Sequence, residues 1–381
     1  MASGSASAAP ITSPPRRSLR PLALFNGSYL GPKPTGIGVV ARDLVAALDP
    51  ALVPLLEPTA DPPGEDAPRL RPHSIPIPAN LSPADGRKGH LRRLLWTQNQ
   101  LPTLLKAQGS PLLVSPLPEA PLLRGVRSVV LAHDLLPLRY PQPSPLLAYH
   151  LAYVPLVLHR ATRVLCNSEA TAQEVHGRLG VPLRRLITIR LGFDPRELRP
   201  LGLERGAEVL VLSRHDPHKN LVRMLQAFAL LRDPEATLHL VGPHNARLTP
   251  RLQALARDLG IDHRCQWSPW VSDHERLLLL NRCGVLVIPS LWEGFGLPAL
   301  EAMACGAPVV AARAGALPEV VGDAALLVDP RQPAAIADAI GSCLREPALA
   351  RHAAVEGPRR AARFSWAETG IQLTQLLHDL V

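Results

Sequence analysis

Residues 285–306 read VLVIPSLWEGFGLPALEAMACG, and this stretch is the strongest guide to the fold. Val285 to Ile288 is an unbroken apolar run, which is typical of a strand in a parallel sheet that is covered on both faces. A loop with two glycines follows it. Pro298 then suits the start of a helix, and Gly306 suits the residue just past its end. The stretch therefore predicts a buried strand, a glycine loop and a short helix in succession.

Similar apolar runs recur along the chain and alternate with segments of helical spacing, such as Leu252, Leu255 and Leu259. Strand–helix alternation repeated this often predicts α/β architecture with doubly wound, Rossmann-like parallel sheets. The runs expected to be strands are Leu22–Phe25, Pro111–Ser115, Ser128–His133, Arg163–Asn167, Ile187–Leu191, Glu208–Ser213, Thr237–Val241, Val285–Pro289, Pro308–Ala312 and Ala325–Val328.

The domain organisation follows from a polar segment with Pro and Gly at residues 195–207, after which a fresh strand begins. A length of 381 residues suits two domains. We expect a disordered tail over residues 1–19, a first domain over 20–200 and a second over 207–364. Ligands of such sheets bind outside the carboxyl ends of the strands, so we expect a site in a cleft where the domains face each other.

Two further segments have a predicted structure. Thr59 to Pro83 is rich in proline and poorly patterned, which predicts a mobile loop. Ser365 and Glu368 have the spacing of a capping box, which predicts a helix over residues 365–381. That helix is either the last packed helix of the second domain or one that crosses back to the first.

Composition excludes several classes of protein. Hydrophobic residues make up 46% of the chain, which is too many for a disordered protein. The five cysteines are widely spaced and form no CxxC, which argues against a disulfide framework or a structural zinc site and favours a cytoplasmic location. No apolar run reaches the ~20 residues of a membrane span.

Positive charge is concentrated in the first half of the chain. Residues 1–200 carry 23 basic and 13 acidic side chains, whereas residues 201–381 carry 18 and 19. This imbalance indicates either a merely basic surface or an anionic partner such as a membrane or a phosphorylated acceptor. The segment Arg87–Trp96 interleaves basic residues with Leu and Trp. Such a segment suits a helix that lies on the inner face of an anionic membrane or meets a lipid-diphosphate acceptor. The alternative is a solvated helix with a buried Leu/Trp face.

The glycine loop at 294–296 is a candidate site for a diphosphate. Gly294 and Gly296 leave backbone N–H groups open before a helix, where the helix dipole favours an anion. Glu293 precedes the glycines, and Glu301 is expected in the first helical turn. A carboxylate accepts two hydrogen bonds at once, so each could hold a pair of adjacent hydroxyls. The plainer alternative is that Glu301 is only a favourable acidic residue at a helix start and Glu293 only a loop charge.

At this point the sequence resembles a known family. The string from Glu293 to Gly306 is similar to the E-x7-E signature of retaining, nucleotide-sugar-dependent glycosyltransferases of family 4, including bacterial mannosyltransferase-like members. The resemblance implies the GT-B fold of two Rossmann-like domains, with the acceptor bound by the first and the nucleotide sugar by the second. It also implies that Arg214 and Lys219, in an R-x4-K arrangement after a strand, bind the donor diphosphate.

Three segments of the first half resemble the family as well. His133-Asp134 at a strand end is similar to a segment in which the histidine lies against the donor sugar. Gly36 and Gly38, in Thr35-Gly36-Ile37-Gly38, match a glycine loop that lies against the donor phosphates. Ser168 matches a helix entry of the family and is equally well read as a plain N-cap.

The resemblance thus implies a retaining hexosyltransferase for polysaccharide or glycolipid assembly, with a mannose-type or glucose-type sugar and GDP-mannose as the favoured donor. The implied catalytic residues are His133, Arg214, Lys219 and Glu293. The implied donor-binding residues are Gly36, Gly38, Arg214, Lys219, Gly294, Phe295, Gly296, Leu297 and Glu301. No Asp-x-Asp pair occurs, so neither a metal nor another cofactor is expected.

Two alternatives remain open at the level of sequence. One is a sugar-nucleotide epimerase or phosphorylase on the same fold. The other is a non-enzymatic anion-binding protein. Nucleic acid is not an expected partner, because no nucleic-acid motif accompanies the scattered basic residues.

Overall fold

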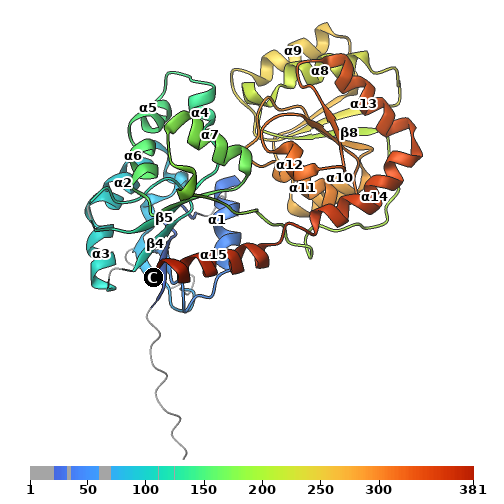
Figure 1. Cartoon of the computed structure of the whole chain (residues 1–381). Helices are drawn as coiled ribbons and strands as arrows, with labels where there is room; N and C mark the ends of the chain where they lie inside the picture. Colours follow the sequence, from blue (N-terminus) through green and yellow to red (C-terminus); the bar gives the residue numbers. More distant parts are fainter. Residues whose placement is uncertain (1–20, 32–35, 60–69, 110, 124) are drawn as a thin grey trace, which may run out of the picture.

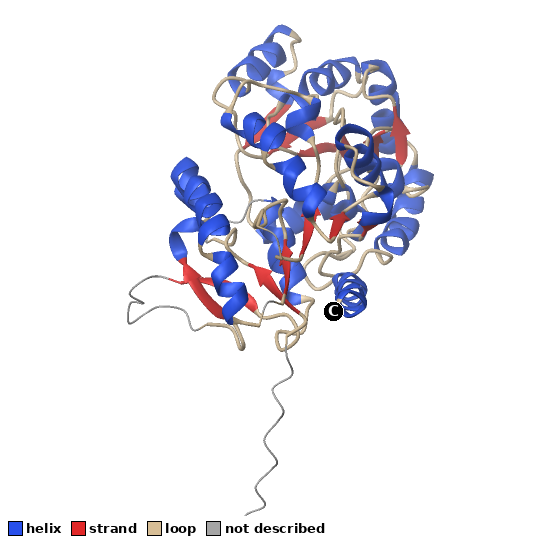
Figure 2. Ribbon diagram, turned by 60° about the vertical axis from the view of Figure 1, so that its left-hand side comes forward, coloured by secondary structure: helices blue, strands red, loops and turns tan. Residues whose placement is uncertain are grey.

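The computed structural model describes residues 21–31, 36–59, 70–109, 111–123 and 125–381. Two domains lie side by side, and each consists of a parallel sheet between layers of helices (Figure 1 and Figure 2). The two Rossmann-like sheets predicted from the sequence are confirmed. The expected tail over residues 1–19 lies outside the described residues.

The first domain contains a seven-stranded sheet in the order β3-β2-β1-β4-β5-β6-β7. Its strands are β1 (Ala23–Asn26), β2 (Leu55–Thr59), β3 (Ile75–Pro78), β4 (Leu112–Ser115), β5 (Ser128–Ala132), β6 (Arg163–Cys166) and β7 (Leu186–Thr188). Its helices are α1 (Gly36–Ala46), α2 (Gly86–Asn99), α3 (Leu101–Ala107), α4 (Leu136–Arg139), α5 (Pro145–Ala152), α6 (Val154–Arg160) and α7 (Glu169–Leu179).

The second domain contains a six-stranded sheet in the order β10-β9-β8-β11-β12-β13. Its strands are β8 (Glu208–Leu212), β9 (Thr237–Val241), β10 (Cys265–Ser268), β11 (Val285–Ile288), β12 (Val309–Ala312) and β13 (Leu326–Val328). Its helices are α8 (Leu221–Leu230), α9 (Thr249–Asp258), α10 (Asp273–Arg282), α11 (Leu297–Ala304), α12 (Leu317–Val321), α13 (Pro333–Arg345) and α14 (Pro347–Ala361), and α15 (Trp366–Leu380) follows.

Each sheet reverses its strand order at one point. In the first sheet this point lies between β1 and β4, and in the second between β8 and β11. The connections on the two sides of such a point leave in opposite directions, which opens a crevice at the carboxyl ends of the strands. The loops after β8 and β11 carry Arg214, Lys219 and Glu293, so the fold places these predicted site residues at the crevice of the second sheet.

One sequence-based prediction of a loop was wrong. Residues 59–83 were expected to form a mobile loop throughout, but Ile75–Pro78 forms β3, which pairs with β2. Prolines at 76 and 78 hid this strand, because proline cannot donate to a sheet ladder. β3 lies at the edge of its sheet, where one side of the strand needs no partner.

The last helix, α15, crosses back to the first domain and packs against α1, as Figure 1 shows. Gly370 allows this approach, since a Cβ there would lie 2.2 Å from the carbonyl oxygen of Ala47. The predicted capping box at its start is wrong. Ser365 makes no side-chain cap, and the Glu368 carboxylate instead accepts a hydrogen bond from Gln372, one turn further along the helix.

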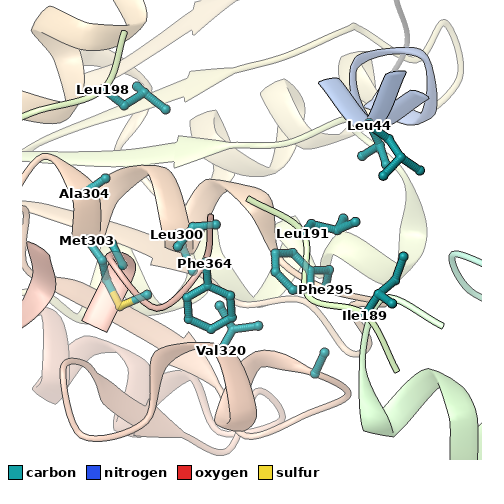
Figure 3. Packing of buried hydrophobic residues seen from close by; sticks show 14 of the residues in the cluster. Leu44, Ile189, Leu191, Leu198, Phe295, Leu300, Met303, Ala304, Val320 and Phe364 are labelled. Carbon is teal, nitrogen blue, oxygen red and sulfur yellow. The ribbon is translucent and has the colours of Figure 1, made fainter. Parts of the chain in front are cut away.

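Buried apolar residues from both domains form one continuous cluster, part of which Figure 3 shows. Phe295, from the glycine loop, packs edge-on against Phe364 with ring centroids 5.8 Å apart. Ile189 and Leu191, which follow the last strand of the first sheet, belong to the same cluster. The domains are therefore joined by a hydrophobic contact as well as by the chain.

Candidate functional site

The glycine loop is shaped by packing on both sides. Gly296 has φ +98°, which favours glycine, and it caps α11. At Gly294 a Cβ would lie 2.2 Å from the carbonyl oxygen of His133, in the first domain. This second constraint was not expected from the sequence: Gly294 is required because the two domains meet there.

The backbone of the loop suits an anion. Within the described part of the chain, the amides of residues 294–297 have no hydrogen-bond acceptor. They precede α11, whose dipole adds positive potential at its N-terminus. Gly306, at φ +67°, ends the same helix as predicted.

Phe295 has one role for its side chain and another for its backbone. Its side chain is buried in the core against Phe364, so any contact with a donor would come from its backbone amide. Leu297 is half-buried as the first residue of α11 and can likewise offer its amide.

Lys219 and Glu293 come together although they are 74 positions apart. The Lys219 Nζ donates to Glu293 Oε1 at 2.7 Å, and the Ser290 hydroxyl donates to the same oxygen at 2.6 Å. The side chains of the ion pair are 18% and 13% exposed, so water screens the pair little. Ala316 donates to the Glu293 carbonyl oxygen at 3.0 Å, which fixes the backbone as well.

Arg214 lies apart from that pair. It follows β8, its side chain is 68% exposed, and its Nε lies 3.1 Å from the Asp216 carboxylate. The guanidinium therefore remains accessible to a ligand from solvent. Its surface position means that its removal disturbs little of the folded structure.

Glu301 lies one turn later than predicted. Because α11 begins at Leu297, Glu301 is in the second helical turn and not the first, so it does not act as a helix-start charge. Arg276 Nη1 donates to its Oε1 at 3.1 Å. Burial raises the pKa of Glu301, and the charge of Arg276 opposes that rise.

His133 lies at the end of β5 with a defined tautomer when neutral. Its Nε2 lies 2.8 Å from the carbonyl oxygen of Pro116, which can only accept, so Nε2 carries the proton and Nδ1 is an acceptor. Burial lowers the pKa of His133 to about 4. The ring is therefore neutral at pH 7 and presents a hydrogen-bond acceptor.

We expect this burial to make the stability of the protein fall in mild acid. His133 protonates in the unfolded chain near its usual pKa of about 6.5 but resists protonation in the fold. The free energy of unfolding should thus fall as the pH drops from about 6.5 towards about 4. Urea unfolding of wild type and His133→Gln at several pH values measures this, because the difference between them isolates His133 from other buried histidines. An identical pH slope in both proteins would contradict it.

Residues at the start of α7, in the first domain, form hydrogen bonds with the glycine loop. The Ser168 hydroxyl donates to the Gly294 carbonyl oxygen at 2.7 Å, and Thr171 Oγ1 donates to the same oxygen at 3.2 Å. Ser168 is also the N-cap of α7. The N-cap predicted for Ser168 is confirmed, and its contact with the glycine loop was not predicted.

Glu319 of the second domain adds a contact that the sequence did not indicate. Its two carboxylate oxygens accept hydrogen bonds from the backbone amides of Glu169 and Ala170, each at 3.0 Å. A carboxylate at a helix N-terminus is favourable, and here it belongs to the opposite domain. Glu319 therefore fastens α7 to the second domain.

Replacing Glu319 by glutamine should weaken this contact moderately. The variant keeps the shape of the side chain but loses its charge and one acceptor, which costs about 1 kcal/mol of unfolding free energy. Chemical denaturation of the variant beside Glu235→Gln, at an exposed position just before β9 in the second domain, measures the difference. Equal stability of the two variants would show that the cap contributes nothing.

Two aromatic contacts also join the domains and were missed from the sequence. The Arg139 guanidinium lies 3.5 Å from the centre of the Trp292 ring. Tyr140 stacks on His218, with ring centroids 6.1 Å apart. Arg139 and Tyr140 follow the His133-Asp134 segment, but no residue pattern indicated their partners in the other domain.

The glycines of the first domain are placed as follows. Gly36 begins α1 and is exposed, with open space where a side chain would be, whereas Gly38 is buried in the same helix. Thr35, from the same motif, lies outside the described residues. The expected contact of the donor with Gly36 and Gly38 stays a prediction.

Two kinds of feature are absent from the described residues. Among them, no group of three or more His, Cys, Asp and Glu side chains is arranged to hold a metal ion. No helix in the described ranges combines the length and the apolar character needed to cross a membrane. Metal independence stays a prediction.

Comparison with known proteins defines the class. Residues 34–197 match the family described as Glycosyltransferase Family 4, and residues 195–360 match the family described as Glycosyl transferases group 1. The chain belongs to the family 4 glycosyltransferases, as the resemblance of its motifs predicted.

Individual relatives agree with this assignment. The chain is 36% identical over 224 residues to an MMP α-(1→4)-mannosyltransferase of Mycolicibacterium hassiacum, covering 57% of this chain and 54% of the relative. It is 30% identical over 261 residues to the O-antigen chain mannosyltransferase B of Escherichia coli, covering 63% and 67%. The matched part spans about half the length of the first of these relatives.

A solved structure confirms the fold. Sucrose-phosphate synthase from Thermosynechococcus elongatus superimposes with a TM-score of 0.76 at 24% identity, covering 95% of this chain and 99% of that one. This likeness confirms the predicted GT-B arrangement of two parallel-sheet domains.

Proposed function

We propose that the protein is a retaining glycosyltransferase that moves a hexose from a nucleotide diphosphate sugar to a glycan or glycolipid acceptor. The observation that carries this proposal is the site at the crevice of the second sheet. There the partly buried Lys219–Glu293 pair lies beside a glycine loop whose amides are open to an anion. A diphosphate and the hydroxyls of a sugar are the ligands that such groups suit.

Each group has a task in the proposed reaction. The amides of residues 294–297, together with Arg214 and Lys219, bind the diphosphate and stabilise the charge that grows on it as its bond to the anomeric carbon breaks. Glu301 holds the ribose hydroxyls, and Glu293 holds hydroxyls of the sugar. The acceptor oxygen attacks the same face that the diphosphate leaves, and the acceptor proton passes to the departing diphosphate. No covalent nucleophile is assigned.

His133 completes the sugar site as an uncharged group. With its Nε2 proton bonded to Pro116, its Nδ1 can accept a hydrogen bond from a sugar hydroxyl. A neutral ring also adds no positive charge beside the anomeric carbon, which itself becomes positive in the transition state. Closure of the domains around the donor excludes water, so that transfer competes with hydrolysis.

The favoured donor is GDP-mannose, and the setting is polysaccharide or glycolipid assembly. The two relatives described above are named as mannosyltransferases, which agrees with the sequence motif around His133. Neither a metal nor another cofactor is part of the proposal, because the helix N-terminus and the two basic residues supply the positive potential.

Association with the inner face of the membrane is part of the proposal. On α2, Leu91 and Leu95 are 59% and 54% exposed, next to the exposed Arg87 and Lys88. The predicted buried Leu/Trp face is only half present, since Trp96 is buried and these leucines are not. Exposed leucines flanked by basic residues suit the surface of an anionic bilayer.

A panel of nucleotide sugars tests the proposal. Each is added to the purified full-length chain, and both thermal stabilisation and release of the nucleoside diphosphate are measured. We expect stabilisation and release with one guanine or uracil nucleotide sugar, undiminished by a chelator. Failure of every nucleotide sugar to stabilise the protein or to turn over would refute the proposal.

A further inference from the structure

A cavity in the first domain lies at the carboxyl edge of the first sheet, where the strand order reverses between β1 and β4. Its volume is about 280 Å³, and it is lined by loops after β1, β4 and β5 and by α2 and α5. His133 and Asp134 form one wall. The backbone of His133 touches Gly294 of the donor loop, so the cavity opens beside the place where the donor sugar would lie.

The only lysine or arginine among the described residues that line this cavity is Arg93, and its charge is already neutralised. Its Nε and Nη2 donate to the two oxygens of Glu119 at 2.7 and 3.0 Å. Its Nη1 donates to the Leu81 carbonyl oxygen at 2.9 Å. The two side chains of the pair are 3% and 2% exposed, so the guanidinium cannot turn to a ligand without breaking a buried ion pair.

The remaining polar groups are mostly hydrogen-bond acceptors. His150 Nδ1 lies 2.9 Å from the carbonyl oxygen of Leu146 and must donate to it, which leaves Nε2 as an acceptor. Asp134 uses Oδ1 to accept from the Leu136 amide at 2.9 Å and keeps Oδ2 as an acceptor. Hydroxyl groups can donate to both, whereas a phosphate dianion has no proton to give.

His90 adds a hydrogen-bond donor to these acceptors. Arg93 donates to His90 Nδ1 at 2.9 Å, so the proton of the neutral His90 ring is on Nε2. Burial lowers the pKa of His90 and of His150, which keeps both rings uncharged at pH 7. The ring of Tyr149, held by its hydroxyl at 3.3 Å from Glu119 Oε1, supplies an apolar surface. The cavity thus has no free positive charge and a hydrogen-bonding set that matches a polyol.

We propose that this cavity binds an uncharged sugar ring of the acceptor, so that the protein glycosylates a neutral glycoside and not a phosphorylated one. This inference rests on the proposed function and adds the class of acceptor to it. A volume near the lower end of small-molecule sites suits one ring at a time. The excess positive charge of residues 1–200 therefore lies on surfaces outside this cavity and does not bind the acceptor ring.

Equilibrium binding without any donor tests the inference directly. Methyl α-D-mannopyranoside and inositol 1-phosphate are titrated separately into the full-length protein, and heat is measured. We expect the glycoside to bind at least about tenfold more tightly than the phosphate. His150→Ala should weaken glycoside binding by about tenfold through the lost hydrogen bond. His159→Ala, the same change on an exposed residue of α6 away from the cavity, is the matched control.

A gain of anion binding provides a second test. Glu119→Gln removes the counter-charge of Arg93 and leaves the guanidinium buried and unpaired. Inorganic phosphate should then raise the melting temperature of this variant but not that of the wild type. If Glu119→Gln does not fold, the glycoside affinities of His150→Ala and His159→Ala still test whether the cavity binds a sugar ring.

The outcomes separate this inference from the proposed function. Preference of the wild type for inositol 1-phosphate, or equal glycoside affinity in His150→Ala and His159→Ala, would overturn the inference even if nucleotide sugars are turned over. Binding of the glycoside without turnover of any nucleotide sugar would support the sugar preference of the cavity and overturn the proposed function.

Discussion

Replacing Arg214 by alanine is expected to lower kcat/KM for sugar transfer by about 10³-fold while the melting temperature stays unchanged. The loss follows from removing a cation that faces the growing negative charge of the departing diphosphate. Stability should not change, because the side chain is 68% exposed and an exposed pair such as that of Arg214 with Asp216 contributes little. Steady-state kinetics with the donor identified by the nucleotide-sugar panel measure the effect.

The matched control for Arg214 is Arg251→Ala. Arg251 is another exposed arginine of the second domain, in the first turn of α9. It should keep wild-type kinetics, which would show that loss of a surface charge alone is harmless. Near-normal transfer by Arg214→Ala would show that Arg214 does not bind the diphosphate.

Replacing Glu301 by alanine is expected to lower kcat/KM by about 10²-fold or more, mainly through a higher KM for the donor. A carboxylate that holds the ribose is far from the bond that breaks, so it contributes to ground-state and transition-state binding alike. The fold should survive, because Arg276 keeps its second partner, Asp273, at 3.1 Å. Separate kcat and KM values for Glu301→Ala therefore test the role as well as the importance of the residue.

Asp273→Asn is the matched control for Glu301. The Asp273 side chain is 84% exposed and is the other carboxylate partner of Arg276. Its replacement leaves Glu301 in place. Wild-type KM in this variant would show that Arg276 needs only Glu301 to stay in position. If both variants raise KM equally, the effect belongs to Arg276 and not to hydroxyl binding by Glu301.

Much of the fold could be predicted because its strands are short and apolar throughout. All ten expected strands are present, with ends that differ by at most three residues, as at Ile187–Leu191 and β7. The strands that were not predicted are β2, β3 and β10. Proline interrupts the first two, and β10 reads Cys-Gln-Trp-Ser at a sheet edge, where none of its four residues is fully buried. Such strands lack the unbroken apolar pattern.

The site was predictable where a motif specifies local backbone, and less so where distant segments meet. The strand–glycine-loop–helix unit formed as expected, and the fold brought Lys219 to Glu293. No residue pattern indicated that Ser168 holds Gly294 or that Glu319 caps α7. These two contacts join segments that are 126 and 150 positions apart, respectively. The buried position of Phe295 was missed for the same reason, since its neighbour Phe364 comes much later in the chain.

The return of α15 to the first domain has a mechanical consequence. The polypeptide passes between the two lobes twice, and the two passages lie side by side where Phe193 and Ser365 form a parallel β-bridge. A single connection would let the domains rotate in any direction, but two adjacent connections act as a hinge. We therefore expect the domains to rotate about this hinge. The contact between His133 and Gly294 then separates, and substrates enter from that side.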